Sequence, residues 1–461
     1  MIPNVLATRY ASREMRDVWS PTAKVVMERE LWLAVLRAQR ELGVDVPEGV
    51  VEAYEAVIDK VDLDSIEARE RVTKHDVKAR IEEFCALAGH QHIHKGMTSR
   101  DLTENVEQLQ VRRSLELVRD RMVAALARLA DRASEHAETA ITGRTHNVPA
   151  QVTTVGKRFA NAGEEVLQAF ARVDELLARY PLRGIKGPVG TQQDMLDLLG
   201  DPAKVDELER RVAAHLGFAA LLDDVGQVYP RSLDFDVVSA LVQAASGPAN
   251  LAKTIRLMAG HGLATEGFAA GQVGSSAMPH KRNTRSCERI GALATVLTGH
   301  ATMAAGLVGD QWNEGDVSCS VVRRVVLPDA FFAVDGVFET LLTVLDGFAV
   351  FPEAVSRELD RNLPFLATTK IMLALVKEGV GREEAHQIVQ GHAIATPDGV
   401  EFLERLEADP RVPAGVMRQV DVDPLAYAGA AVAQVEAFCR RVDAVVNRYP
   451  IAAEYRPEGI L

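Results

Sequence analysis

A long, unbroken helical stretch constrains this chain more than any other feature of its sequence. Residues 103–142 contain neither Gly nor Pro and consist mostly of residues that favour a helix. Apolar side chains recur there at steps of three and four residues, the period of one helix face: Leu115, Val118, Met122, Leu126, Leu129 and Ala133. A helix over the whole stretch would be roughly 60 Å long at about 1.5 Å per residue. Such a helix is typical of an extended bundle.

The rest of the chain also indicates helices. Helical patterns cover five further stretches: residues 151–180, 204–216, 233–262, 284–310 and 318–347. Alternating strand patterns are almost absent, so we predict an all-α fold. We expect three helical parts, residues 1–102, 103–351 and 352–461, of which the second is a central long-helix bundle. Residues 290–309 carry no formal charge but few large aliphatic side chains, which favours a buried bundle helix over a membrane span.

Charge balance and cysteine content exclude several classes of function. The 461 residues include 52 Lys+Arg against 65 Asp+Glu, a formal net charge of −13. This balance argues against nucleic-acid binding, which needs a basic face. The cysteines lack the spacing of a metal site or a disulfide framework and favour reduced thiols: Cys85, Cys287, Cys319 and Cys439. With no signal-peptide pattern visible, we expect a cytoplasmic protein that acts on small molecules.

The most informative polar segment is residues 271–283, GQVGSSAMPHKRN. Its glycines, serines and proline indicate a loop between two helices. Such a loop can close over a substrate and exclude water. Helix N-terminal amides together with Lys281 would suit a carboxylate. From composition alone, the alternative is an ordinary solvated surface loop.

GSSAMPHKRN resembles the signature loop of the fumarase/aspartase superfamily, and within it is most similar to the adenylosuccinate lyases. Five further strings resemble motifs of that family, in the family's order: TKHDV (73–77), HKGMTSRD (94–101), GRTHNVPAQ (143–151), RGIKGPVGT (183–191) and GQVYPR (226–231). The resemblance runs from Arg9 to about Arg324, and the C-terminal helices are compatible with it. It implies a fumarase/aspartase-like all-α fold.

The resemblance implies a β-elimination that breaks a C–N bond. In the family, a succinyl group leaves its nitrogen as fumarate, which converts adenylosuccinate to AMP and SAICAR to AICAR in purine nucleotide biosynthesis. The reaction forms a dianionic intermediate next to a carboxylate, so cations and hydrogen-bond donors must already surround it. A general base removes one proton and a general acid supplies another. No metal and no cofactor is implied.

Five residues match catalytic positions of the family. Ser275 would be the general base, activated by hydrogen-bond donors and by Lys281. His146 would be the general acid, because imidazole titrates near neutral pH. His75 is the rival histidine, placed second in the proton path or in contact with the substrate. Glu288 lies two helical turns after Lys281, so we expect both on one helix face, with Glu288 paired to a catalytic histidine.

The resemblance also implies a set of substrate contacts. Thr98 and Ser99 would hold a substrate carboxylate, and Asn283 would help Lys281 to bind one from the loop. Arg9 and Tyr10 would grip the 5′-phosphate. The remaining implied contacts are Asp76, His94, Thr145, Gln227, Arg289, Ser320 and Arg324, the last two at the phosphate end of a later motif. For Arg9 and Tyr10 the plain alternative is an ordinary surface position, and for His94 it is a turn residue.

Two positions depart from the family pattern. The proline that usually follows the signature asparagine is Thr284 here, which alters the start of the next helix. Many members carry an arginine in an ERTxxDS string where this chain has Gly315. A cation that helps to hold phosphate or ribose is therefore missing. This changes the expected phosphate site but not the elimination.

Alternatives to this function remain at the level of sequence. Argininosuccinate lyase, fumarase, aspartase or a carboxymuconate cycloisomerase would share the loop but would not need the phosphate contacts. A non-catalytic structural role, known in the superfamily, would not need Ser275, Lys281 and Glu288 together with His146. The resemblance further implies a homotetramer whose active sites are each built from three subunits. The wide separation of His94, His146 and Ser275 in the chain agrees with that assembly.

Overall fold

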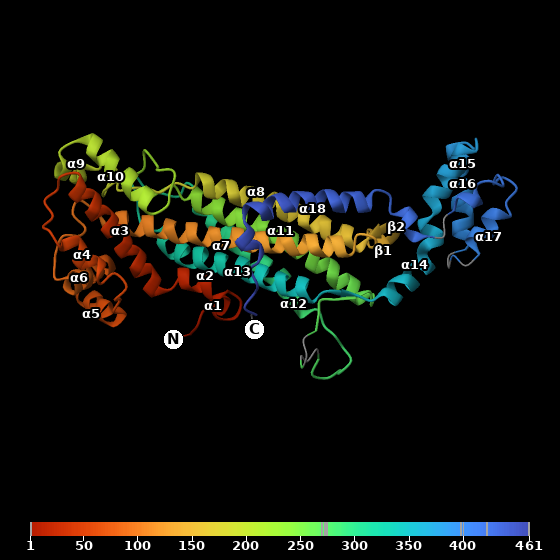
Figure 1. Cartoon of the computed structure of the whole chain (residues 1–461), viewed down its shortest axis with the longest axis horizontal. Helices are drawn as coiled ribbons and strands as arrows, with labels where there is room; N and C mark the ends of the chain where they lie inside the picture. Colours follow the sequence, from red (N-terminus) through yellow and green to blue (C-terminus); the bar gives the residue numbers. More distant parts are fainter. Residues whose placement is uncertain are drawn as a thin grey trace.

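The computed structural model describes residues 2–268, 271, 275–396, 399, 401–420 and 423–459. Helices dominate these residues, and the longest of them run along one elongated body (Figure 1). The prediction of an all-α fold is confirmed. Within the described ranges, we find no helix with the length and apolar character needed to cross a membrane.

The first helices form one end of the body, drawn in red and orange in Figure 1. They are α1 (Val5–Arg9), α2 (Arg13–Val18), α3 (Pro21–Glu41), α4 (Val50–Glu55), α5 (Leu63–Thr73) and α6 (Asp76–Ala88). Polar residues start them: the side chains of Ser12, Ser20 and Asp62 accept hydrogen bonds from backbone N–H groups of α2, α3 and α5. Two later helices, α9 (Gln193–Leu199) and α10 (Pro202–His215), lie at the same end.

Five long helices form the central bundle. They are α7 (Ser99–Glu135), α8 (Val155–Arg179), α11 (Ser232–Gly260), α12 (Arg285–Ala305) and α13 (Cys319–Gly347). All six apolar residues that predicted the long helix lie fully buried in one hydrophobic core, where each large aliphatic side chain contributes about 1.5–3 kcal/mol. The expectation of a fully buried helix over residues 290–309 is wrong for one chain, because only one face of α12 packs on the bundle.

The chain forms a β-hairpin where we predicted the end of a helix. α7 ends at Glu135, and β1 (Ala140–Thr145) then pairs antiparallel with β2 (Val148–Thr154). The predicted helix is therefore wrong beyond Glu135. The absence of Gly and Pro does not itself distinguish a helix from a strand. The β-branched pair Ile141 and Thr142 fits a paired strand better than a helix, and both residues are buried there.

The remaining elements form the other end of the body and the return of the chain. β3 (Ala264–Thr265) pairs antiparallel with β4 (Ala349–Val350). After β4 come α14 (Pro352–Leu366), α15 (Thr368–Lys377), α16 (Arg382–Ala395), α17 (Phe402–Glu407), the 3₁₀ turns η1 (Met417–Gln419) and η2 (Pro424–Tyr427), α18 (Ala431–Arg448) and α19 (Pro450–Ala453). A second, smaller core lies among α15, α16 and α17, whereas α18 returns along the bundle (Figure 1). The division of the chain at residues 102 and 351 stays a prediction.

Candidate active site

Asp101 organises the predicted contacts at the start of α7. Thr98, the N-cap of α7, forms a capping box with Asp101 and donates its backbone N–H to that carboxylate at 2.8 Å. The other carboxylate oxygen accepts a 2.6 Å hydrogen bond from Arg183 and two more, of 2.9 and 3.0 Å, from backbone N–H groups of the loop 183–187. Asp101 and Arg183 are both fully buried. This carboxylate therefore fixes Thr98 and Ser99 against the loop.

His94 and His75 lie near this point. His94 Nδ1 accepts a 3.0 Å hydrogen bond from the indole N–H of Trp32, so the neutral ring carries its proton on Nε2. Burial, with repulsion from His75 and Lys78, lowers the pKa of His94 to about 4 against the opposing charge of Asp101. His94 is therefore uncharged at neutral pH and can donate a hydrogen bond. His75 is the N-cap of α6 and its ring is half exposed; its Nδ1 accepts the backbone N–H of Lys78 at 3.2 Å.

Asp76 directly follows His75 at the start of α6. Its carboxylate forms an ion pair with Arg80 one turn later, and one oxygen lies 3.8 Å from His75 Nδ1. Burial favours the neutral acid, but Arg80 and a backbone hydrogen bond outweigh it and lower the pKa of Asp76. Asp76 is thus a carboxylate at neutral pH, beside the ring of His75.

Gln227 joins the group at the start of α7. Its backbone N–H donates a 2.6 Å hydrogen bond to the carbonyl of Glu314, and Arg183 donates a 3.0 Å hydrogen bond to the carbonyl of Gly226. A Cβ added at Gly315 would lie 2.9 Å from Gln227 Cβ, and the φ of Gly315 is +148°. The glycine that stands in place of the family's arginine therefore suits this close contact.

Ser320 and Arg324 lie one turn apart near the start of α13. Ser320 is half-buried and Arg324 is exposed. The intervening Arg323 is buried and donates hydrogen bonds to Asp234 of α11 at 2.7 Å and to Glu107 of α7 at 2.5 Å. These bonds hold the start of α13 beside the start of α7, so Ser320 and Arg324 belong to the same group.

His146 stands at the tip of the β-hairpin. His146 and Asn147 join the two strands and have φ values of +51° and +62°, as in a two-residue type I′ turn. Thr145 and His146 are both exposed. Arg144, in β1, forms an ion pair with Glu358 of α14 and ties the hairpin to that helix. The hairpin therefore presents the imidazole of His146 outward from its own chain.

Glu266 fixes both ends of the glycine-rich loop. It follows β3 directly, is 6% exposed, and accepts hydrogen bonds of 2.9 Å from the backbone N–H groups of Ser286 and Cys287 in the first turn of α12. Next to it, a Cβ added at Gly267 would lie 2.8 Å from Gly347 Cα, so the two glycines allow a close backbone contact. The loop therefore leaves and rejoins the body at one fixed place.

Ser275 lies within that loop and is half-buried. Its Oγ accepts hydrogen bonds from the backbone N–H groups of Ala277 at 3.4 Å and Met278 at 3.1 Å. Such donors would stabilise a hydroxyl that loses its proton. Residues 272–274 of the predicted loop lie outside the described residues.

Lys281, Asn283 and Glu288 line one cavity of about 580 Å³ between the start of α12 and the end of α11. Our expectation that Lys281 and Glu288 share a helix face is wrong, because α12 begins only at Arg285 and Lys281 precedes it. The two side chains reach the same cavity from a loop and from a helix. Glu288 lies 3.6 Å from Arg256 of α11, an exposed pair.

Arg9, Tyr10 and Arg289 form a positive group beside α12. The guanidinium of Arg289 lies 5.6 Å from the centroid of the Tyr10 ring. Burial, together with the charges of Arg285 and Arg9, lowers the pKa of Arg289. A bound anion would relieve this repulsion. A Cβ added at Gly336 would lie 2.9 Å from the Tyr10 carbonyl oxygen, so this glycine allows the N-terminal segment to approach α13.

The chain therefore holds its predicted site residues in three groups: at the start of α7, at the hairpin tip, and at the loop and start of α12 (Figure 1). α7 has 37 residues, so its ends are roughly 55 Å apart at about 1.5 Å per residue. The first two groups lie at those ends. The predicted phosphate contacts fall into two of these groups. Arg324 lies about 12 residues along α13, or roughly 18 Å, from Gly336, against which Tyr10 packs. One copy of the chain therefore leaves the group at the start of α7 far from the hairpin tip.

Three residues that position the site were not predicted from the sequence: Asp101, Arg183 and Glu266. The TxxD capping box at residues 98–101 is visible in the sequence and could have identified Asp101. Arg183, in contrast, lies 82 positions from Asp101, and no local pattern links such a pair. Across the part of the chain that the structure describes, no three His, Cys, Asp or Glu residues cluster in a way that could hold a metal ion.

Comparisons with known proteins agree along almost the whole sequence. The family model described as Lyase matches residues 11–299, and the one described as Adenylosuccinate lyase C-terminus matches residues 364–442. The adenylosuccinate lyase of Saccharomyces cerevisiae is 34% identical over 455 residues, which cover 95% of this chain and 93% of the yeast protein. That of Schistosoma mansoni is 32% identical, with 97% and 96% covered.

Solved structures share the fold. The fumarate lyase from Mesorhizobium sp. BNC1 aligns with a TM-score of 0.80 and 24% identity over 94% of this chain and 98% of that one. The 3-carboxy-cis,cis-muconate lactonizing enzyme from Pseudomonas putida aligns with a TM-score of 0.83 and 20% identity over 96% and 99%. They confirm the predicted superfamily fold. The family models and the full-length relatives go further and show that the chain belongs to the adenylosuccinate lyase family.

Proposed function

We propose that this protein is a C–N lyase that eliminates fumarate from adenylosuccinate to give AMP, and from SAICAR to give AICAR, in purine nucleotide biosynthesis. The match along nearly the whole chain to proteins named adenylosuccinate lyase carries the proposal. The positive group of Arg9, Tyr10 and Arg289 supports a substrate that bears a phosphate. Such a group favours a nucleotide over the substrates of an argininosuccinate lyase or a fumarase.

In the proposed elimination, Ser275 Oγ removes the proton from the succinyl carbon next to a carboxylate. Ser275 Oγ accepts hydrogen bonds from two backbone N–H groups, which support its anionic form. Lys281 and Asn283 bind the carboxylate that gains charge. The electron pair of the C–N bond then passes to nitrogen, and His146 supplies the proton that this nitrogen takes up. The electron pair of the C–H bond forms the C=C bond of fumarate and that of the C–N bond stays on nitrogen, so nothing is oxidised by an external acceptor and the reaction needs no redox cofactor.

The histidines at the start of α7 take supporting roles in this proposal. His94 is neutral, because its pKa is lowered to about 4, and donates a hydrogen bond from Nε2 to the substrate. His75 takes the second place in the proton path: a proton taken up on Nδ1 would replace the hydrogen bond from Lys78 N–H and face the carboxylate of Asp76. Thr98, Ser99 and the other contacts of this group hold the second carboxylate and the nucleotide.

We also propose a homotetramer in which three subunits supply one residue group each to every active site. The roughly 55 Å between the ends of α7 supports this assembly, because one copy leaves the group at the start of α7 far from the hairpin tip. Apolar side chains on the open faces of α12 and α13 support it as well: Val296 and Met303 are each 41% exposed and Val321 is 75% exposed. A second copy would cover these faces. We expect this assembly to act in the cytoplasm.

The decisive test is an ultraviolet assay of the purified protein with adenylosuccinate and with SAICAR, followed by chromatography of the products. Equal amounts of AMP and fumarate are expected from the first substrate. Turnover of argininosuccinate or a carboxymuconate instead would assign the chain to a sibling reaction. Sedimentation tests the assembly separately, and a fully active monomer would exclude shared sites.

A further inference from the structure

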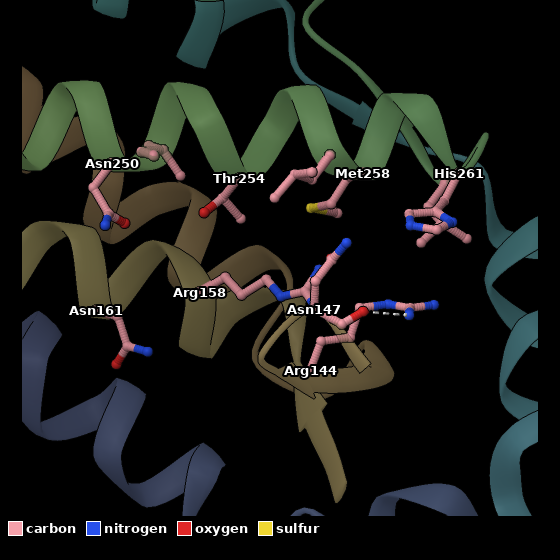
Figure 2. Close-up of a pocket in the computed structure, with 11 residues that line it drawn as sticks. Arg144, Asn147, Arg158, Asn161, Asn250, Thr254, Met258 and His261 are labelled. Carbon is pink, nitrogen blue, oxygen red and sulfur yellow. Dashed lines mark hydrogen bonds between the residues drawn. The ribbon is translucent and has the colours of Figure 1, made fainter. Parts of the chain in front are cut away.

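A cavity of about 270 Å³ lies between the β-hairpin and the facing helices α8 and α11 (Figure 2). Arg144 and Asn147 reach it from the hairpin and Arg158 from α8, opposite Asn250 and Thr254 of α11. Pockets for drug-sized ligands usually occupy about 300–1,000 Å³. This cavity therefore suits a small ligand.

Positive charge in the cavity is only partly neutralised. Arg144 is paired with Glu358, which does not line the cavity. Arg158 donates a 2.9 Å hydrogen bond to the carbonyl of Thr142, and among the described residues no carboxylate lies within ion-pair distance of its guanidinium. Burial and the charge of Arg144 lower the pKa of Arg158, against the opposing effect of Glu358. Two guanidinium groups thus share one carboxylate.

The remaining polar lining is neutral or basic. Asn147, Asn250 and Thr254 can donate hydrogen bonds, and His261 stands at the end of α11. The described lining contains no Asp or Glu. We propose that this cavity is a binding site for a small anion, a carboxylate or a phosphate, which Arg158 and Arg144 hold from two sides.

The site would couple an anion to the hairpin. Asn147 follows His146 in the two-residue turn, Arg144 lies two residues before His146 in β1, and Arg158 is fixed on α8. An anion that accepts hydrogen bonds from both guanidinium groups would tie the hairpin to the bundle, because guanidinium groups bind carboxylate and phosphate in fixed, bidentate geometry. This anion site does not depend on the proposed elimination. Arg144, Asn147 and Arg158 have no assigned part in that reaction, although the hairpin that carries Arg144 and Asn147 also carries His146.

Met258 offers a site-specific readout, because it lines the cavity and is only 4% exposed. The full-length protein, labelled at its methionine methyl groups, is titrated by NMR in low-chloride buffer with inorganic phosphate and, separately, with succinate. The Met258 signal is assigned from Met258→Leu. We expect it to shift and saturate, and the probe with the lower Kd distinguishes a phosphate site from a carboxylate site. Arg158→Gln should weaken binding roughly tenfold to a hundredfold.

Two further variants separate this site from the proposed active site and from loss of folding. Lys281→Met removes a cation from the proposed catalytic carboxylate contact and should leave the Kd at Met258 unchanged. Asn250→Asp changes an exposed residue, adds a carboxylate to the cavity and should weaken binding even if Arg158→Gln does not fold. The proposal would be overturned if the Met258 signal did not shift with either anion, or if all variants had the same Kd. Turnover is not the readout, so failure of the proposed elimination would remain a separate result.

Discussion

The carboxylate of Glu266 accepts a 2.9 Å hydrogen bond from the backbone N–H of Cys287 and so joins the residue before the glycine-rich loop to the helix after it. The bond is buried, and a second one to Ser286 accompanies it. A buried carboxylate that accepts two backbone N–H groups holds the two segments firmly together, because hydrogen bonds to a charged group are stronger than those between neutral groups. The positions of Lys281 and Asn283 relative to the bundle therefore depend on Glu266.

We predict that Glu266→Gln lowers the free energy of unfolding by about 1–3 kcal/mol, because the amide NH₂ would face a backbone N–H that it cannot accept. Turnover should fall while substrate affinity changes less, since the loop is displaced but its side chains remain. Urea unfolding and steady-state kinetics measure the two effects. Glu353→Gln, in the first turn of α14 and 93% exposed, is the matched control and should change neither. If Glu266→Gln and Glu353→Gln had the same stability and turnover, Glu266 would not be the residue that fixes the loop.

His146→Asn should reduce turnover by roughly 10²–10⁴, the usual contribution of a positioned acid or base. Asparagine tolerates the positive φ of this turn position, so folding and assembly should be unchanged. Val148→Thr, at an exposed position beside the turn, is the control and should keep wild-type turnover. Near-normal turnover in His146→Asn would move the general acid elsewhere, with His75 the next residue to test.

Ser275→Ala should still bind adenylosuccinate within about tenfold of the wild-type Kd but release fumarate at least roughly 10²-fold more slowly. The methyl group cannot take a proton, whereas Lys281 and Asn283 would still hold the carboxylate. Calorimetric binding together with single-turnover measurements separates the two effects. Ser276→Ala, at the exposed neighbouring position, should stay active. If the two variants behave in the reverse order, the base is the second serine.

The sequence predicted the bundle because burial of one helix face repeats every 3.6 residues, and Leu115 through Ala133 follow that period. It missed the hairpin because residues 136–142 contain no helix breaker, and the pairing of Ile141 with Thr153 depends on a partner strand. Motif strings located the site residues. Their arrangement could not be predicted, because the contact of Asp101 with Arg183 is long-range and the hairpin tip lies at the other end of α7 from that contact.

A buried acidic pair lies behind the N-terminal segment that carries the predicted phosphate contacts. Asp335 accepts a 2.6 Å hydrogen bond from the backbone N–H of Ser12, and Glu339, one turn later in α13, accepts one of 2.7 Å from the Tyr455 hydroxyl. Arg121 lies 3.1 Å from Glu339. Burial and the neighbouring Asp335 raise the pKa of Glu339 from its ordinary 4.5 to about 7, and burial raises the pKa of Asp335 as well.

The folded protein therefore holds a proton on Glu339 that the unfolded chain releases near pH 4.5, so this contribution to stability is lost as pH rises toward about 7. We predict that between about pH 4.5 and pH 7 the free energy of unfolding of the wild type falls by on the order of 3 kcal/mol relative to that of Glu339→Gln. Glutamine can still accept the Tyr455 hydrogen bond but cannot ionise. Urea unfolding across this range measures the difference, and Asp335, whose pKa burial also raises, contributes a dependence of the same sign to both proteins. Parallel curves for the two proteins would mean that Glu339 ionises with an ordinary pKa in the folded protein, and that its burial beside Asp335 makes no pH-dependent contribution to stability.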